Sequence, residues 1–412
     1  MGEFESRRSS MPIVARTGES AEARIDVGLL VAHSPRSDPG PLQAFGERMI
    51  EDSLPELAAA TDVGWRVHAG EPDPLGDGAS RRPSEFLDEA ALRMVEGPYD
   101  LVVVVTDVPL TSRVEKRVPG LASPISRVVV VSTRWLLAPP GRDRIRSLGT
   151  EAVRWNAATL LLHLIGHVLG ASHRDGGGIM EPFAFDRTRE TVPSFDAGVR
   201  GHLRHGATRV PEDASSRGRV RRLGFHVLSV ARNPSKVLAA LVHSRAPLLP
   251  LSLPKLLTAA VTPTLILVFS AETWDVGLNL TNGTAVLFAT LSIIAATVHF
   301  TFTQHLTFPR ERTQVITEHM ALVNVTVFFI ILLAMVGVFV LVGSIILLIE
   351  LVVFPPNLMT NWPSLEDPSV GGVDLLRIAA FISSIGVLTG SLAGGIEDRM
   401  AVRHLALFLG RP

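Results

Sequence analysis

The chain of 412 residues contains no cysteine. Disulfide bonds are therefore excluded, and the cysteine content gives no indication of an oxidising compartment. The N-terminus lacks an apolar core as well, because it reads MGEFESRRSSMPIVARTG, so we do not predict a secretory signal peptide. We expect residues 1–23 to form a disordered leader.

Charged residues become scarce beyond about residue 255. Up to about residue 245 the chain is rich in Arg, Asp, Glu, Pro and Gly, as in a soluble domain. Four apolar runs follow, each close to or above the roughly 20 residues needed to cross a bilayer. The predicted transmembrane helices are 256–274, 284–302, 321–354 and 373–396. The third is longer than a bilayer requires, so we expect it to tilt or project beyond the membrane.

Lysine and arginine are missing from the loops after the first and third predicted spans. The other exposed segments are basic: Arg217, Arg219, Arg221, Arg222, Arg232, Lys236, Arg245 and Lys255 before the first span, Arg310 and Arg312 after the second, and Arg399, Arg403 and Arg411 in the tail. Basic loops remain cytoplasmic, so we predict a multi-pass cell-membrane protein with both termini in the cytoplasm. Arg377 is the exception, and it is close enough to the end of its span to reach the interface.

Residues 201–254 are predicted to form a basic amphipathic linker between the two halves. Apolar and basic residues are mixed over 223–244, with Pro234 as an interruption. Such a segment fits the surface of an anionic inner leaflet. Nucleic acid is the rival partner, but one basic cluster beside a membrane span is better explained by the bilayer. We therefore predict the lipid bilayer as a partner and no nucleic acid.

Three histidines are closely spaced in HLIGHVLGASH, residues 163–173. His163 and His167 are four residues apart, so on a helix their rings share one face. Gly170 allows a sharp turn that brings back His173 as a third ligand. Three imidazoles leave one position of a tetrahedral Zn²⁺ open, as in catalytic sites. The simpler alternative is a buried apolar helix that merely carries histidines.

These residues resemble a known family. HLIGHVLGASH followed by GGGIM is similar to the metzincin zinc peptidases, and most similar to the archaemetzincins, which share the glycine at Gly166 and the short gap to Met180. YDLVVVVTDVPL and SRVVVVSTRWL resemble their last strands before the active-site helix. The resemblance implies that His163, His167 and His173 bind one zinc ion and that Met180 forms the methionine turn.

Two departures from the family pattern concern its chemistry. The general-base glutamate is replaced by Leu164, which can neither accept nor relay a proton. General-base assistance is worth ~10²–10⁴ in rate, so the resemblance implies a pseudopeptidase or a very slow enzyme. Glu181 is a weak candidate for a replacement base. The cysteines of the family's second zinc site are absent, with Arg174 and Gly178 in two of their places, so we expect no second structural zinc.

The region 24–200 is predicted to be an α/β metzincin-like zinc domain with a mixed sheet. Strands are expected at 25–32, 63–68, 101–106 and 128–132, and helices at 42–60, 84–96 with a serine cap, and 151–169, which carries the histidines. This helix should pack behind the sheet. The region 255–412 is predicted to be the helical transmembrane domain.

Glycines recur every fourth residue in the last predicted span, at Gly386, Gly390 and Gly394. Such spacing allows a second helix to approach closely, within the bundle or from another copy of the chain. Three functions stay open. The chain is a cytoplasm-facing zinc-binding pseudopeptidase that holds a peptide or protein partner, an active metallopeptidase with an unusual base, or a membrane sensor or transport-associated protein with a regulatory soluble domain.

Overall fold

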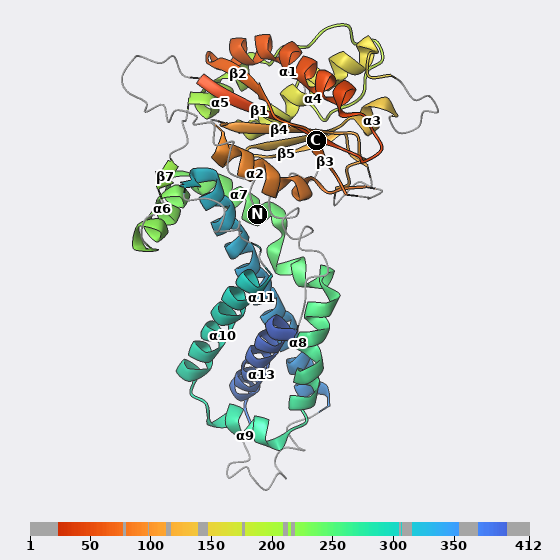
Figure 1. Ribbon diagram of the computed structural model, residues 1–412. Coiled ribbons are helices and arrows are strands. Elements are labelled where there is room, and N and C mark those ends of the chain that lie inside the picture. The colour runs from red at the N-terminus through yellow and green to blue at the C-terminus, as the bar shows by residue number, and fades with distance from the viewer. Residues whose placement is uncertain are drawn as a thin grey trace, which may run out of the picture.

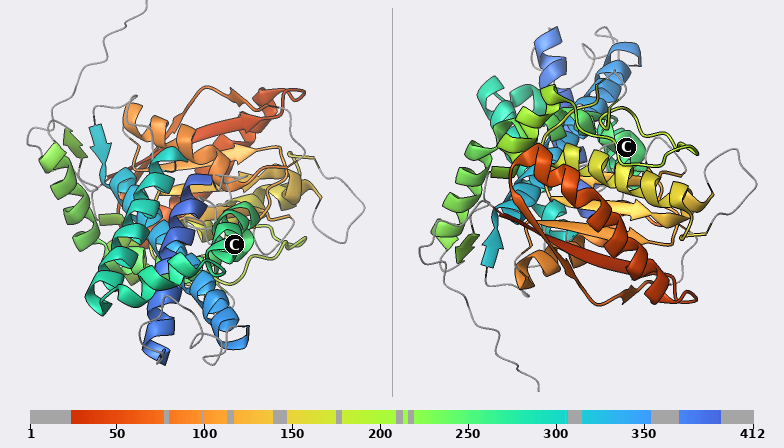
Figure 2. Two further views of the ribbon diagram at one scale, coloured as in Figure 1. Left: turned by 90° about the horizontal axis from the view of Figure 1, so that it is seen from below. Right: turned by 90° about the horizontal axis from the view of Figure 1, so that it is seen from above.

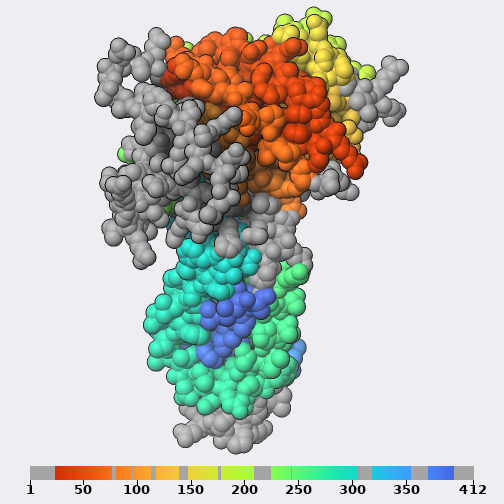
Figure 3. Space-filling view, in the orientation of Figure 1, coloured from red at the N-terminus to blue at the C-terminus, as the bar shows by residue number. Residues whose placement is uncertain are grey.

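The computed structural model describes residues 24–76, 80–97, 99–112, 117–138, 147–174, 178–208, 213–215, 219–304, 306, 315–353 and 370–393. The predicted leader 1–23 and Gly394 lie outside these residues. A sheet with flanking helices occupies one end of the molecule, and a helical bundle extends away from it (Figure 1). In the space-filling view the bundle forms a narrower column beneath the sheet domain (Figure 3).

The sheet is mixed, as predicted. Its strand order is β2-β1-β4-β6-β5, with β3 also paired to β1. The strands are β1 (Arg24–His33), β2 (Gly64–Ala69), β3 (Asp73–Pro74), β4 (Leu101–Thr106), β5 (Gly120–Ser123) and β6 (Val128–Ser132). All neighbours are parallel except β5, which forms an antiparallel pair with β6 at the edge.

Both faces of the sheet are buried, which explains the continuous valine runs of β4 and β6. Alternate residues belong to two different cores, because side chains alternate across a strand. Val103 and Val105 pack with α1 (Pro39–Thr61) and α4 (Glu151–Val168). Val102 and Val104 pack with α2 (Leu87–Glu96) on the opposite face. Figure 2 shows α1 and α4 side by side across the sheet, so the prediction that the histidine-bearing helix covers one face is confirmed.

Four local features differ from the sequence predictions. The predicted serine cap at Ser84 is wrong, because Ser84 is buried inside a 3₁₀ turn, η1 (Pro83–Phe86), and α2 begins only at Leu87. Strand β5 and the short helix α3 (Thr133–Leu137) were not anticipated. Helix α5 (Ala197–Thr208) runs past residue 200, and its buried Leu203 and Ala207 belong to the core under α1 and α4.

The second half is helical, apart from a small β7–β8 pair. Its elements are β7 (Asp213–Ser215), α6 (Arg219–Arg232), α7 (Pro234–Ser244), η2 (Ala246–Ser252), α8 (Pro254–Leu267), α9 (Ala271–Asn279), α10 (Asn282–Thr303), β8 (Val315–Thr317), α11 (Glu318–Val352) and α13 (Gly372–Ala393). Among the described residues, α10, α11 and α13 are each long and apolar enough to cross a membrane.

The first predicted span, 256–274, is not one continuous helix. Helix α8 ends at Leu267, α9 begins at Ala271, and the segment preceding α8 joins it at a bend of 59°. Hydropathy registers the apolar composition of this stretch but not the change of direction. The 35 residues of α11 correspond to about 52 Å at 1.5 Å per residue, which exceeds the roughly 30 Å hydrocarbon core.

Helix α13 lies centrally in the bundle and contacts α8, α9, α10 and α11. Its glycines face α8: a Cβ on Gly390 would lie 2.9 Å from Ala260 Cβ, and one on Gly386 would lie 3.1 Å from Ala260 O. This close approach occurs within a single chain. Arg377 does not need to reach outward, since it pairs with Asp374 and donates to Leu280 O at 2.5 Å.

The sheet domain and the bundle share one continuous apolar core. It includes Val102 and Val104 of β4, residues of α2, and Leu322 and Val323 near the start of α11. Within the helical half, Asn233 Nδ2 between α6 and α7 donates to Glu318 Oε1 of α11 at 2.5 Å, and both side chains are buried. The junction is thus packed rather than a loose tether.

Candidate metal centre

Helix α4, which is part of the sheet domain, presents two buried histidines four residues apart on one of its faces. All its residues from Asn156 to Val168 are buried, including His163 and His167. The helix ends at Val168, and Gly170 follows two residues later with a φ of 97°, a left-handed conformation that favours glycine. Ala171 N then donates to Gly166 O at 2.9 Å, which closes the turn and directs the following segment back toward the histidines.

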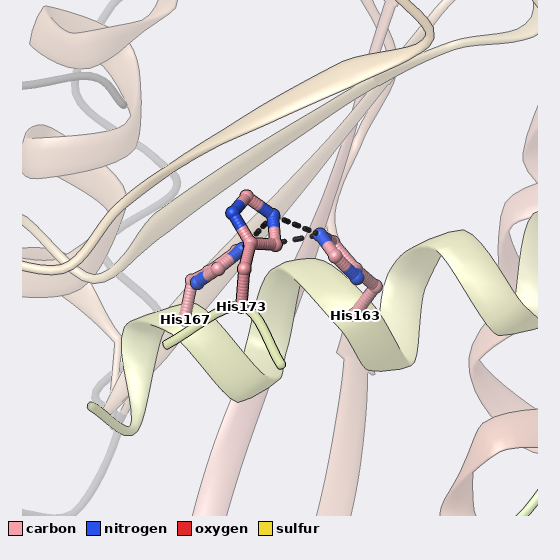
Figure 4. A group of neighbouring side chains, drawn as sticks. All are labelled: His163, His167 and His173. Carbon is pink, nitrogen blue, oxygen red and sulfur yellow. Dashed lines mark hydrogen bonds between the residues drawn. The ribbon is translucent and has the colours of Figure 1, made fainter. Parts of the chain in front are cut away.

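The three histidine rings converge on one point (Figure 4). The Nε2 atoms of His163 and His167 are 3.1 Å apart, as are those of His167 and His173, and those of His163 and His173 are 3.3 Å apart. Tetrahedral zinc with Zn–N bonds of about 2.0–2.1 Å requires ligand nitrogens about 3.3–3.4 Å apart. The spacing therefore matches one shared zinc ion, and three ligands leave a fourth position open.

The opposite ring nitrogens fix how two of these rings are protonated. His163 Nδ1 donates to Ile179 O at 2.6 Å, and His167 Nδ1 donates to Ala171 O at 2.9 Å. A neutral ring that is protonated at Nδ1 carries a lone pair on Nε2. These two Nε2 atoms are then both acceptors, so their short contact does not fit a hydrogen bond between them and would be satisfied by a shared cation.

Burial favours the same neutral state. Desolvation lowers the pKa of His163 to about 4 and the pKa of His167 to about 3, although the backbone acceptors act in the opposite direction. Both rings are therefore uncharged at neutral pH, which is the form that binds zinc.

Met180 lies beneath the histidine helix in a tight turn. Glu181 N donates to Gly178 O at 3.2 Å, and Arg174 N donates to Met180 O at 3.1 Å, which holds this turn beside the segment that carries His173. A Cβ on Gly166 would lie 2.5 Å from Met180 Sδ, so the glycine makes room for the methionine. The same turn supplies Ile179 O, the acceptor that orients His163.

Leu164 fills its position completely. Its side chain is 1% exposed and points to the edge strand, where a Cβ on Gly120 would lie 2.9 Å from Leu164 Cδ1. The residue after the first histidine therefore forms part of the apolar packing between α4 and β5. It offers no acceptor for a proton.

The described residues contain one cluster that could hold a metal, and it consists of the three histidines alone. Glu181 is not part of it: the residue is half-buried in the turn after Met180. A separate cavity of about 200 Å³ between α1 and the start of α4 includes Phe45 and Arg154 but none of the histidines.

Sequence reasoning missed the groups that orient the site. Ile179 O and Ala171 O are backbone atoms, and no residue type signals their role. Asn156 was also missed: buried in α4, it donates to Asp186 O at 2.5 Å and accepts from Asp186 N at 2.9 Å, which fastens the segment after Met180 to the helix. An amide side chain among the apolar residues of this helix was the only available signal.

No protein-family profile and no curated protein matches the chain. Similar solved structures are zinc peptidases. An archaemetzincin from Methanopyrus kandleri is 20% identical with a TM-score of 0.33, over 48% of this chain and 100% of that chain. A zinc-dependent peptidase from Methanocorpusculum labreanum is also 20% identical, with a TM-score of 0.31, over 42% and 99%. Metalloproteinase-II from Bacteroides fragilis is 14% identical with a TM-score of 0.31, over 47% of this chain and 55% of that chain. TM-scores of this size do not assign the fold.

Proposed function

We propose that this chain is a membrane-anchored zinc-binding protein built on a peptidase-like domain that has lost its general base. The observation that carries the proposal is the convergence of three Nε2 atoms at 3.1–3.3 Å. Two of the three rings are already oriented by backbone carbonyls with their lone pairs toward the common point. Such acceptors behind the ligands are typical of protein zinc sites.

His163, His167 and His173 would hold the ion. Bound zinc would polarise a carbonyl and lower the pKa of a water in the open position. A working peptidase also needs a group that accepts the proton of that water, and Leu164 places an apolar side chain where the family pattern has a carboxylate. Rate loss of ~10²–10⁴ follows from the missing base alone. The domain is then suited to hold a peptide or a protein partner rather than to cleave it.

A slow metallopeptidase is the second candidate. Glu181 favours it, because this carboxylate is in the turn that also orients His163 through Ile179 O. Cleavage by the unaltered chain that disappears in Glu181→Gln but persists in Glu190→Gln, an exposed control on the same segment, would favour this candidate.

Metal content tests the zinc site directly. The full chain, purified in detergent, should contain about one zinc per chain, and His167→Ala should lose it. His202→Ala is the matched control, since His202 is exposed on α5 and belongs to no cluster of ligands among the described residues. Equal zinc content in both variants would contradict the proposal.

The membrane part of the proposal places four spans in the bilayer, with the apolar stretch 256–274 that contains most of α8 as the first, and both termini in the cytoplasm. The basic segments described above support this orientation. The absence of cysteine makes the test simple, because a single introduced thiol has no background. In sealed right-side-out vesicles, an impermeant maleimide should label Asp275→Cys in α9 but not Arg48→Cys in α1. The reverse pattern would overturn the orientation.

A further inference from the structure

Helix α6 leaves an apolar stripe uncovered. Four exposed residues, Gly224, Val227, Leu228 and Ala231, form one face of the helix. Val227 and Leu228 lie three and four residues after Gly224, and Ala231 lies four and three residues after them. Val227 is 63% exposed and Leu228 is 45% exposed. Large apolar side chains that are aligned in this way indicate a surface that is covered by something else.

Helix α7 repeats the pattern. Leu238 is 62% exposed and Val242 is 72% exposed, and they lie four residues apart on one face. Exposed apolar side chains continue along η2 at Leu248 and Leu251, and then along α8 at Ile266. The stripe is therefore continuous in sequence with the apolar outer surface of the bundle.

The opposite face of the two helices is attached to the protein. Both α6 and α7 contact α11, and Ser229 and Val237 are buried on this side. Asn233, at the joint between the helices, is buried and donates to Glu318 of α11. The exposed stripe thus has a fixed orientation and cannot turn inward to bury itself. Figure 1 shows α6 beside the bundle at the level where the sheet domain begins.

The charge of this region is of one sign. Between Asp213 and Glu272 the sequence has no acidic residue, whereas Arg219, Arg221, Arg222, Arg232, Lys236, Arg245 and Lys255 are all basic. Arg232, Arg245 and Lys255 are exposed. An apolar stripe combined with an excess of basic residues is typical of helices that lie in the headgroup region of anionic membranes.

We propose that the exposed face of α6 and α7 binds the surface of an anionic phospholipid bilayer, so that these helices lie in the interface beside the bundle. This inference rests on the proposed membrane insertion of the bundle. The bilayer covers Val227, Leu228, Leu238 and Val242, and the basic residues select anionic headgroups. Contact with the bilayer at this point fixes the height and tilt of the sheet domain above the membrane.

Single labels on the full chain test the proposal. Leu228→Cys, Ile266→Cys and Ala58→Cys each carry one environment-sensitive fluorophore, because the native chain has no other thiol. Ile266 is 70% exposed on α8 and reports insertion of the bundle, whereas Ala58 is exposed on α1 and reports water. The proteins are placed in nanodiscs of phosphatidylcholine alone or with phosphatidylglycerol, and quenching by spin-labelled lipid is measured.

The proposal expects lipid to quench the label at 228 in discs that contain phosphatidylglycerol. Quenching should fall at least fivefold in phosphatidylcholine alone, since each basic residue near an anionic surface is worth about a fivefold change in partitioning. The label at 266 should be quenched in both discs and the label at 58 in neither.

If the label at 266 is quenched, three results for the label at 228 would overturn the interface proposal. The label could remain exposed to water, it could be shielded from water but not quenched by lipid, or its quenching could be equal with and without phosphatidylglycerol. A shielded, unquenched label would point to a protein partner instead. Absence of quenching at 266 would show that membrane insertion itself, and hence the proposed function, is wrong.

Discussion

Replacing Leu164 by glutamate tests whether a missing base is the main defect of the site. The leucine is 1% exposed and packs against the backbone of β5 at Gly120. Glutamate is only slightly longer, so it can adopt a similar path between α4 and β5. Its carboxylate would then lie one residue from His163, in the position that the family pattern gives to the base.

The cost to stability can be estimated from this packing. Loss of a fully buried leucine side chain costs about 2–3 kcal/mol, and an incompletely paired polar group adds about 1–3 kcal/mol. The free energy of unfolding should therefore fall by about 3–6 kcal/mol. Zinc at 1,000 times its dissociation constant offsets about 4 kcal/mol of this, so the zinc-loaded variant should stay folded.

Cleavage of a fluorogenic peptide library by the zinc-loaded full chain is the assay. Leu164→Glu should raise the rate by ~10²–10⁴ over the native chain, because general-base assistance is restored. Leu164→Gln is the matched control: it has nearly the same size and polarity but cannot accept the proton. Equal rates for the two folded, zinc-loaded variants would refute the reasoning and would show that the substrate cleft has changed as well.

Two further changes probe the domain. A Cβ on Gly206 of α5 would lie 2.2 Å from Leu169 O at the end of α4, so Gly206→Ala should lower the free energy of unfolding by about 1–3 kcal/mol. Gly201 in the same helix has nothing within 4 Å of such a Cβ, so Gly201→Ala should raise the free energy of unfolding by about 0.5–1 kcal/mol. Thermal denaturation followed by tryptophan fluorescence distinguishes the two variants, and equal effects would argue against the close approach of α5 to α4. In chelator-treated protein, burial lowers the pKa of His163 to about 4, so between pH 6.5 and pH 4 the unfolded chain binds more protons than the folded chain. The free energy of unfolding should therefore fall as the pH drops from 6.5 to 4, by on the order of 3 kcal/mol for this residue. A free energy of unfolding that stays constant over this range would contradict the burial of His163 as a neutral ring.

Local sequence patterns predicted the helices and strands whose own residues carry a recognisable composition or spacing. The valine run of β4 and the apolar helix with histidines four residues apart are examples. Strand β5 reads GLAS and has no β-branched residue, so it is a strand only because β6 folds back against it. The break after α8 likewise depends on a change of direction that hydropathy does not record.

In the candidate site, likewise, the sequence predicted the metal ligands but not the groups that surround them. The spacing of His163, His167 and His173 is visible in the sequence, and the structure brings their Nε2 atoms together. The acceptors behind the rings are backbone carbonyls, and the packing of Leu164 on β5 is a contact between distant segments. Both follow from tertiary structure, and neither has a signature in a single sequence.

The shared core of the sheet and the bundle has a thermodynamic consequence. Apolar side chains of β4, α2 and α11 belong to one packed cluster, so neither half can lose its structure without exposing surface of the other. The two halves should therefore unfold as one cooperative unit, and a ligand that stabilises one half stabilises the other by linkage. Lipid composition, which acts on the bundle, and metal occupancy, which acts on the histidines, then influence the same melting transition.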